Sequence, residues 1–263
     1  MSKLKDKIVA TVAAVIMVAG AVITGTMLID ITPSPQDAIV SFVDGDVIYV
    51  IPEYNNQPYV ILNNNKPIFE EFEIQAKAYE EYSDLDNLGR CTLASAIVCK
   101  DTMPKRGEKR GSISSVKPTG WVQAKYDSVP GKNLYNRCHL IGWQLTAENA
   151  NKRNLITGTR YLNIDGMLEY ENMVAEYIKE TNGYVAYQIT PIYDDDNLVA
   201  TGVQMEGYSV DDDGQEICFN IFCYNVQPGI EIDYQTGRSR LIEEIKLNSA
   251  LLFINWKIFE KNA

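Results

Sequence analysis

The chain has 263 residues but only one histidine, His139. Five cysteines contain no Cys-x-x-Cys pair, so the ligand pattern of a zinc site is missing. Their odd number argues against a disulfide framework, although a single bridge would suit an exported protein. The sequence also lacks internal repeats and low-complexity tracts, and one compact domain is therefore the default expectation.

The N-terminus carries a membrane-directing signal. Lys3, Lys5 and Lys7 precede an apolar run over Ile8–Leu28 that is long enough to span a bilayer. We predict that residues 1–30 are a signal peptide or an N-terminal transmembrane anchor, followed by a linker over 31–46. Both forms imply an exported protein, either secreted or anchored on the outer face of the cytoplasmic membrane, and the membrane is a partner if the segment is not cleaved.

The first half of the remaining chain predicts a hairpin and a helix. Val47–Ile51 and Tyr59–Leu62 are β-prone and are expected to pair with each other, followed by a turn at Asn63–Pro67. Residues Glu70–Tyr82 are expected to be helical.

The second half is more strongly patterned. Apolar residues recur at helical spacing from Gly166 to Ile178, and Asn182-Gly183 provides a stop signal. Three strands are then expected, over Tyr184–Tyr193, Val199–Val210 and Glu216–Val226. The acidic clusters between these strands could suggest calcium loops, but they lack the closing glutamate of an EF-hand and are better explained as hairpin turns.

Charge is unevenly distributed along the sequence. The chain has a net charge of -11, yet the window from Arg90 to Arg160 contains 13 basic and four acidic residues. Such a bias predicts a local surface for a polyanion, the alternative being a solvated basic face with no partner.

The single histidine lies inside this basic window, in the stretch Leu134-Tyr-Asn-Arg-Cys-His-Leu-Ile-Gly142. A lone histidine is often only a structural residue. In an extended strand, however, Arg137 would share a face with His139, an arrangement that suits phosphate chemistry. Cys138 would point to the opposite face, which argues against a cysteine nucleophile paired with this imidazole.

A second polar segment follows. Four asparagines alternate with basic residues over 149–163: Asn149, Asn151, Lys152, Arg153, Asn154, Arg160 and Asn163. Such amides usually form turns and caps, but neutral oxygen ligands also suit Mg²⁺.

These segments closely resemble the DNA/RNA non-specific endonucleases, in particular the secreted or surface nucleases of streptococci. The resemblance is carried by the following stretches: Lys117-Pro-Thr-Gly-Trp121, Asn136-Arg-Cys-His139, Arg153-Asn-Leu-Ile-Thr-Gly-Thr-Arg-Tyr-Leu-Asn163, Gly166-Met-Leu168, Tyr170-Glu171 and Asn225-Val-Gln-Pro-Gly229. It implies an α+β fold of the ββα-metal type, with a central antiparallel sheet flanked by helices. The nuclease domain would cover residues 47–240, leaving 241–263 as a C-terminal extension.

The resemblance also implies roles for individual residues. His139 falls on the family's general base and Asn163 on its Mg²⁺ ligand, where Mn²⁺ would substitute. Asn154 and Glu171 match a second active-centre asparagine and an acidic residue that holds hydration water of the metal. Arg137 completes the catalytic set, and the expected substrate contacts are Lys152, Arg153 and Arg160.

Three positions depart from the family pattern: Asn136 stands for an aspartate, Cys138 for a glycine and Ala175 for an arginine of several members. The implied substrates are DNA and RNA, cleaved without sequence preference. The alternatives are an anchored nucleic-acid-binding protein without catalysis and, more remotely, a cysteine hydrolase. The sequence identifies no protein inhibitor.

Overall fold

The computed structural model of the chain describes residues 39–43, 46–69 and 74–242. The predicted signal or anchor segment 1–30 lies outside these residues, as does nearly all of the predicted extension 241–263. Within the described ranges, no helix has both the length and the apolar character needed to cross a bilayer.

A six-stranded antiparallel sheet forms the centre of the fold, with the strand order β3-β10-β9-β8-β5-β4. Its strands are β3 (Tyr59–Ile61), β4 (Tyr79–Tyr82), β5 (Ala94–Val98), β8 (Val185–Ile192), β9 (Gly202–Ser209) and β10 (Cys218–Tyr224).

The remaining elements are three hairpins and a few helical segments. The hairpins pair β1 (Ile39–Val43) with β2 (Asp46–Val50), β6 (Tyr135–His139) with β7 (Leu155–Thr159), and β11 (Ile230–Ile232) with β12 (Ser239–Leu241). The helical segments are the 3₁₀ turn η2 (Asn63–Asn65), the short helix α2 (Trp143–Thr146), the π-helical turn η4 (Leu162–Met167) and the helix α3 (Leu168–Thr181).

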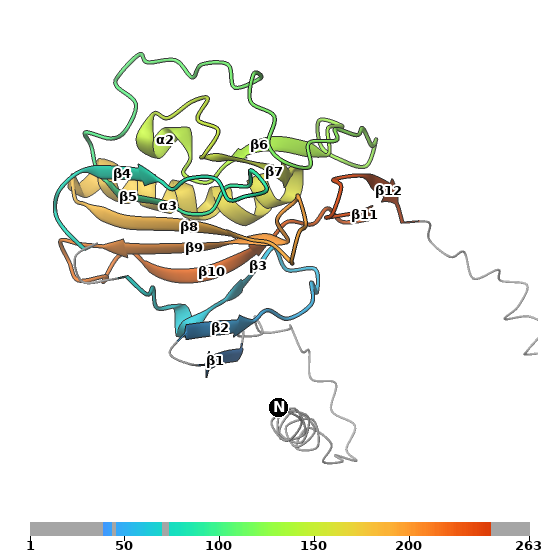
Figure 1. Cartoon of the computed structure of the whole chain (residues 1–263). Coiled ribbons are helices and arrows are strands. Elements are labelled where there is room, and N and C mark those ends of the chain that lie inside the picture. The colour runs from blue at the N-terminus through green and yellow to red at the C-terminus, as the bar shows by residue number, and fades with distance from the viewer. Residues whose placement is uncertain (1–38, 44–45, 70–73, 243–263) are drawn as a thin grey trace, which may run out of the picture. The chain divides into compact units, whose positions relative to one another are not determined.

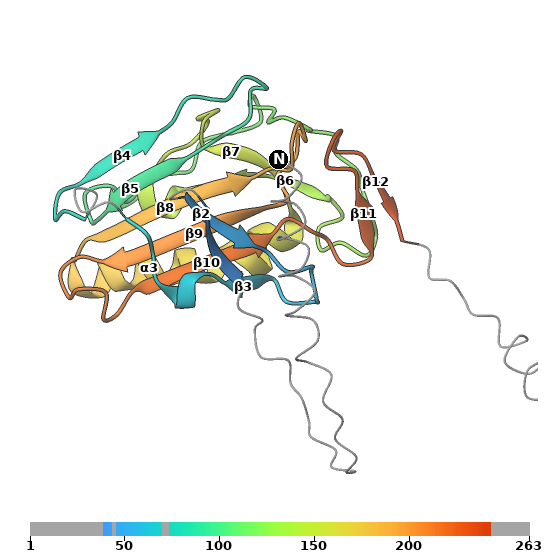
Figure 2. The same cartoon turned by 60° about the horizontal axis from the view of Figure 1, so that its bottom comes forward.

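Helix α3 covers one face of the sheet, as both ribbon views show (Figures 1 and 2). Alternate residues of the central strands point toward this helix because side chains alternate between the faces of a strand. The core contains Val185, Tyr187 and Ile189 of β8 together with Val174 and Ile178 of α3. Cys138 and Ile156 bring the β6–β7 hairpin into the same core, so the strand that carries His139 is held against the helix.

The α+β prediction, with a central antiparallel sheet flanked by helices, is confirmed. The strands expected after Gly183 are β8, β9 and β10, and the helix expected from Gly166 is η4 followed by α3. Within α3, Ala175 is buried in the core, whereas Met173 is 39% exposed.

Two predictions for the first half are wrong. Strand β2 pairs with β1, and β3 pairs with β10, so the expected 47–51 and 59–62 hairpin does not form. Alternation identifies strands but does not identify their partners. The described part of Glu70–Tyr82 contains no helix but ends in β4, where pairing with β5 overrides helix propensity. Strand β1 also occupies residues that were expected to be linker.

Candidate active site

The β6–β7 hairpin directs alternate residues of β6 to opposite sides. Cys138 is buried in the core, where its thiol donates to Asn163 Oδ1 at 3.2 Å and lies 3.5 Å from Met167 Sδ. His139, the next residue, bonds to two other segments. Burial raises the pKa of the Cys138 thiol far above its usual range. A protonated thiol on the other face of the strand cannot act as a nucleophile activated by this imidazole.

Both ring nitrogens of His139 have partners, and these fix its tautomer. Arg110 Nη2 lies 2.9 Å from Nδ1, and the backbone oxygen of Asn149 lies 3.0 Å from Nε2. A guanidinium can only donate and a carbonyl can only accept. The proton of the neutral ring is therefore on Nε2, and the lone pair of Nδ1 faces Arg110.

The environment of His139 favours the neutral imidazole. The side chain is buried, with 5% of its surface exposed. This burial lowers the pKa of His139 from 6.5 to about 4; the Asn149 carbonyl opposes the shift and the Arg110 charge adds to it. The ring is thus uncharged throughout the neutral pH range, and its Nδ1 lone pair accepts a hydrogen bond from Arg110.

A hollow of about 350 Å³ opens beside the imidazole. It is lined by Arg110, His139, Gly142, Trp143, Gln144, Arg160, Asn163, Ile164, Leu168 and Glu171. A second hollow, of about 550 Å³, shares Arg110, Arg160 and Asn163 with the first and adds Asn136 and Arg137. The two hollows together unite residues from the β5–β6 loop, the β6–β7 hairpin, η4 and α3.

Two buried donors in these hollows have no hydrogen-bond partner among the described residues. They are Nε1 of Trp143 and Nδ2 of Asn136. Both residues line a hollow, but these two nitrogen atoms are themselves closed to solvent. With two arginines shared by both hollows, the chemistry favours an anionic ligand rich in oxygen atoms.

Glu171 projects from α3 into the first hollow and packs against the backbone of Gly142. A Cβ atom added at Gly142 would lie 2.6 Å from a carboxylate oxygen of Glu171, so the absence of a side chain makes room for the acid. Burial raises the pKa of Glu171 from 4.5 to about 7, while a hydrogen bond from Gln144 and the charge of Arg110 oppose the shift. The carboxyl group is therefore close to half ionised at neutral pH.

Asn163 lies on η4, the π-helical turn that precedes α3, and lines both hollows. Such turns occur frequently at functional sites because they redirect one side chain from the helical register. An amide oxygen and a carboxylate are hard oxygen donors, the type that Mg²⁺ prefers. The oxygen that accepts the Cys138 thiol retains a second lone pair, so Asn163 and Glu171 fit a hydrated divalent cation.

Three predicted site residues lie elsewhere. Asn154 is completely buried, and its carboxamide binds both backbone polar groups of Ile141. Arg153 pairs with Asp84 at 2.5 Å, and neither Arg153 nor its neighbour Lys152 lines the two hollows. Asn154 thus supports the backbone that follows His139.

Arg137 lines the second hollow, but two of its three guanidinium nitrogens donate to the β5–β6 loop. Nε donates to the Val116 carbonyl at 2.5 Å and Nη2 to the Ser114 carbonyl at 3.1 Å. The guanidinium also stacks on Trp121, with its carbon 4.3 Å from the ring centroid. Arg137 therefore holds the loop in the structure.

Sequence reasoning missed two residues at the imidazole. In the sequence, Arg110 is one of 13 basic residues between Arg90 and Arg160, and Asn149 is one of four asparagines over 149–163. Arg110 is 29 residues from His139 along the chain, and a contact across an irregular loop leaves no periodic signal in the sequence.

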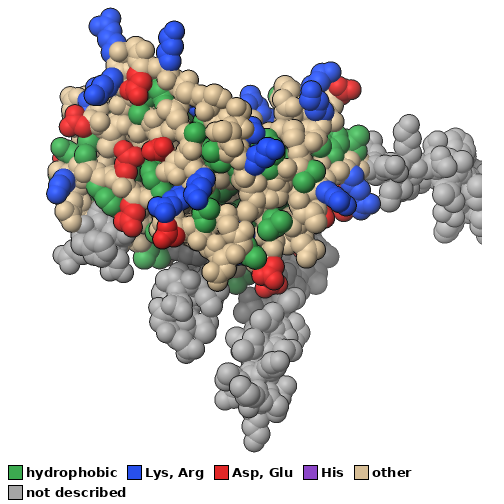
Figure 3. All heavy atoms as spheres, turned by 45° about the horizontal axis from the view of Figure 1, so that its top comes forward, with side chains coloured by type: hydrophobic (Ala, Val, Ile, Leu, Met, Phe, Trp, Pro, Cys, Tyr) green, Lys and Arg blue, Asp and Glu red, His purple; other side chains and the backbone are tan. Residues whose placement is uncertain are grey.

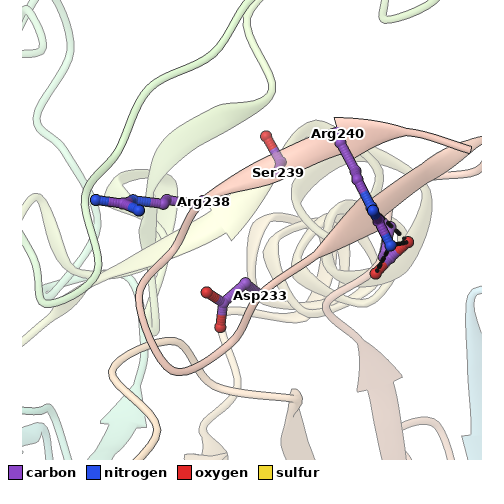
Figure 4. Close-up of a pocket in the computed structure, with 5 residues that line it drawn as sticks. Asp233, Arg238, Ser239 and Arg240 are labelled. Atoms are coloured by element: carbon purple, nitrogen blue, oxygen red, sulfur yellow. Dashed lines mark hydrogen bonds and ion pairs between the residues drawn. The ribbon is translucent and has the colours of Figure 1, made fainter.

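The distribution of charged side chains on the outer surface does not by itself reveal the site. On the face that carries the long β5–β6 loop, Lys and Arg side chains are spread among Asp and Glu (Figure 3). A smaller hollow, of about 260 Å³, lies on the β11–β12 hairpin. There Arg240 pairs with Glu231, while Arg238 extends to the other side of the hairpin (Figure 4). The lining of this hollow contains carboxylates but no imidazole.

Strand β6, the turn η4 and the helix α3 thus present a neutral imidazole, a carboxamide and a carboxyl group to a common hollow. The model of the family described as DNA/RNA non-specific endonuclease matches residues 71–211, more than half of the chain. The chain belongs to this family. That membership supports a nuclease function. Ala175 is buried in the core.

Solved nucleases share the architecture of this endonuclease. NucA from Streptococcus agalactiae, solved with a magnesium ion bound, is 26% identical, with a TM-score of 0.63 over 72% of this chain and 90% of NucA. The metal-free NucA structure is 28% identical, with a TM-score of 0.61 over 72% and 89%. The Sda1 nuclease, solved with a zinc ion, is 24% identical, with a TM-score of 0.58 over 72% and 97%. The ββα-metal fold is thereby confirmed.

Proposed function

We propose that this endonuclease hydrolyses phosphodiester bonds of DNA and RNA, with His139 as the general base. The observation that carries the proposal is the tautomer of His139: Nε2–H is held by the Asn149 carbonyl, and the lone pair of Nδ1 faces a hollow lined by arginines. A base that removes a proton from water needs such an unprotonated nitrogen next to the scissile phosphate.

The reaction is a simple hydrolysis. Nδ1 of His139 takes a proton from water, the water oxygen bonds to phosphorus, and the bond from phosphorus to the 3′ oxygen breaks. The leaving 3′ oxygen receives a proton from solvent, which yields a 3′-hydroxyl and a 5′-phosphate. Nothing in this step requires a base edge or a 2′-hydroxyl, so both nucleic acids are substrates without sequence preference.

Arg110 and Arg160 bind the phosphate in this proposal. Both line the two hollows, and a guanidinium forms paired hydrogen bonds with phosphate oxygens. Arg110 Nη2 donates to Nδ1 of His139 at 2.9 Å. An incoming phosphate competes for this guanidinium, and its transfer to the phosphate frees Nδ1 for water.

Mg²⁺ is the proposed cofactor, with Mn²⁺ as a substitute. Asn163 would hold it, with Glu171 contacting its hydration shell; when bound, the cation supplies Lewis-acid stabilisation of charge on the phosphate and the leaving oxygen. NucA is more similar to this chain than the Sda1 nuclease is, and its structure with bound magnesium supports this choice. The described residues contain no group of three His, Cys, Asp or Glu side chains that could hold a metal.

Asn163→Ala is expected to abolish turnover and weaken Mn²⁺ binding in electron paramagnetic resonance titrations, because a site with so few ligands cannot spare one. Asn163→Asp, which retains an oxygen donor, is the matched control and should still bind Mn²⁺. An Asn163→Ala protein that binds Mn²⁺ with unchanged affinity would place the metal elsewhere.

Plasmid digestion separates catalysis from its main alternative, a protein that binds nucleic acid without cleaving it. We expect degradation in Mg²⁺ that stops when EDTA is added and resumes when Mg²⁺ is restored. Retention of the plasmid on a gel without cleavage at any Mg²⁺ concentration would favour the binding protein. Export to the cell exterior belongs to the same proposal and rests on the basic and apolar N-terminal sequence.

A further inference from the structure

Asn149 contacts both sides of the catalytic unit. Its backbone oxygen accepts the Nε2 proton of His139 at 3.0 Å, and its side-chain Oδ1 accepts the backbone N–H of Gly111 at 2.7 Å. Its Nδ2 donates to the Ala147 carbonyl at 3.2 Å. One end of the carboxamide thus meets an N–H and the other a carbonyl, so its orientation is uniquely determined.

The hydrogen bond from the Gly111 N–H to Asn149 fixes the backbone position from which the Arg110 side chain extends. Gly111 follows Arg110 directly in a loop that joins β5 to β6 without regular secondary structure between residues 99 and 134. A Cβ atom at Gly111 would lie 3.3 Å from Oδ1 of Asn149, closer than most side chains tolerate, so a glycine suits this approach. From this tether the guanidinium of Arg110 reaches Nδ1 of His139 at 2.9 Å.

We propose that the side chain of Asn149 is a positioning residue that docks the Arg110 loop beside the general base. This inference rests on the proposed function, in which Arg110 passes from Nδ1 to the scissile phosphate. A long side chain on an untethered loop loses conformational entropy each time it is placed. The hydrogen bond from the Gly111 N–H to Asn149 Oδ1 already restricts the loop, so less conformational entropy is lost when the Arg110 side chain is placed. The effective concentration of Arg110 at the site is therefore higher.

A double-mutant cycle tests the coupling. Asn149→Ala keeps the backbone carbonyl on Nε2 and removes only the tether; it should lower kcat on duplex DNA by about 5- to 30-fold with less than about threefold change in KM. Arg110→Ala should lower kcat by on the order of 100-fold. In the Arg110→Ala background, Asn149→Ala should cost less than about twofold, because its effect passes through Arg110.

A measurement without catalysis accompanies the cycle. Hydrogen exchange of the Gly111 amide in the substrate-free protein should be slow in the wild type and at least about tenfold faster in Asn149→Ala. Asn149→Asp retains an oxygen acceptor and should restore the slow exchange. Asn151 lies two residues from Asn149, and its side-chain oxygen accepts the Arg153 N–H. Asn151→Ala removes that contact only and should leave Gly111 exchange unchanged.

The outcomes are distinguishable. Additive losses in the double variant, or unchanged Gly111 exchange in Asn149→Ala with an unchanged melting temperature, would overturn the role of Asn149 while leaving the nuclease proposal intact. A wild-type protein that cleaves neither DNA nor RNA would refute the proposed function, whereas the exchange experiment would still report whether the tether exists.

Discussion

Two ionisable side chains in the hollow are held away from their ordinary behaviour in opposite ways. The pKa of His139 is lowered to about 4, and that of Glu171 is raised to about 7, with burial as the main cause in both. Burial disfavours whichever form carries charge, so it favours the neutral imidazole and the protonated acid. The imidazole is therefore uncharged at neutral pH, whereas ionisation of Glu171 destabilises the fold as pH rises through about 7.

The raised pKa of Glu171 predicts that replacing this side chain with a neutral one stabilises the protein more at high pH than at low pH. Because its pKa in the folded protein lies above the unfolded value, its stabilising contribution is present at low pH and is lost as pH rises through about 7. In EDTA at pH 8, Glu171→Gln should therefore be more stable than the wild type by about 1–3 kcal/mol. Urea unfolding at pH 8 and pH 5 measures the difference, which should shrink at pH 5. An equal gain at both pH values would indicate improved packing instead.

At the level of elements, the β6–β7 hairpin depends on the close approach of its two strands. Gly158 of β7 is paired with Asn136 and lies diagonally across from Cys138 of β6, and a Cβ atom added there would lie only 2.6 Å from that of Cys138. Gly158 and Cys138 are both buried against η4 and α3.

Gly158→Ala should therefore destabilise the protein by about 1–3 kcal/mol, the usual effect of overpacking, with a lower urea midpoint. Gly131→Ala is a useful contrast, since a Cβ atom there meets nothing within 4 Å and only its positive φ of 78° opposes the change. If the two variants lose equal stability, backbone conformation rather than the contact with Cys138 dominates.

The elements differ in how far the sequence predicts them. The three-strand meander and α3 were predictable because each element continues for seven or more residues, long enough for its pattern to be read. The partners of β2 and β3 were not, because pairing is decided by distant strands. His139, Asn163 and Glu171 were located by motif and meet in one hollow, whereas Arg110 and Asn149 depend on a loop conformation that no local pattern encodes.

For the whole molecule, charge distribution decides how nucleic acid is bound. The chain carries a net charge of -11, so the binding surface must be local. Arg110 and Arg160 line the hollows, whereas Lys152 and Arg153 lie outside them. The sequence predicts contacts for Lys152, Arg153 and Arg160, and the structure adds Arg110.

Salt titrations of DNA binding in EDTA rank these contacts. Each phosphate contact contributes a slope of about -0.9 in log affinity against log salt, so Arg160→Ala should flatten the slope by about that amount. Lys152→Ala with Arg153→Ala is the matched comparison, and a flattening there would extend the binding surface beyond the hollows. An unchanged slope in Arg160→Ala would exclude a phosphate contact at this arginine.

The central claim, that His139 is the general base, is tested most directly by His139→Gly with added imidazole. We expect the rate to fall by on the order of 10²–10⁴ and to recover in part with imidazole. The wild-type base has a pKa of about 4, whereas free imidazole titrates near 7, so the rescued activity should require a distinctly higher pH than wild-type activity. A folded variant that imidazole fails to rescue at any pH, or one that keeps near-normal activity, would contradict the account.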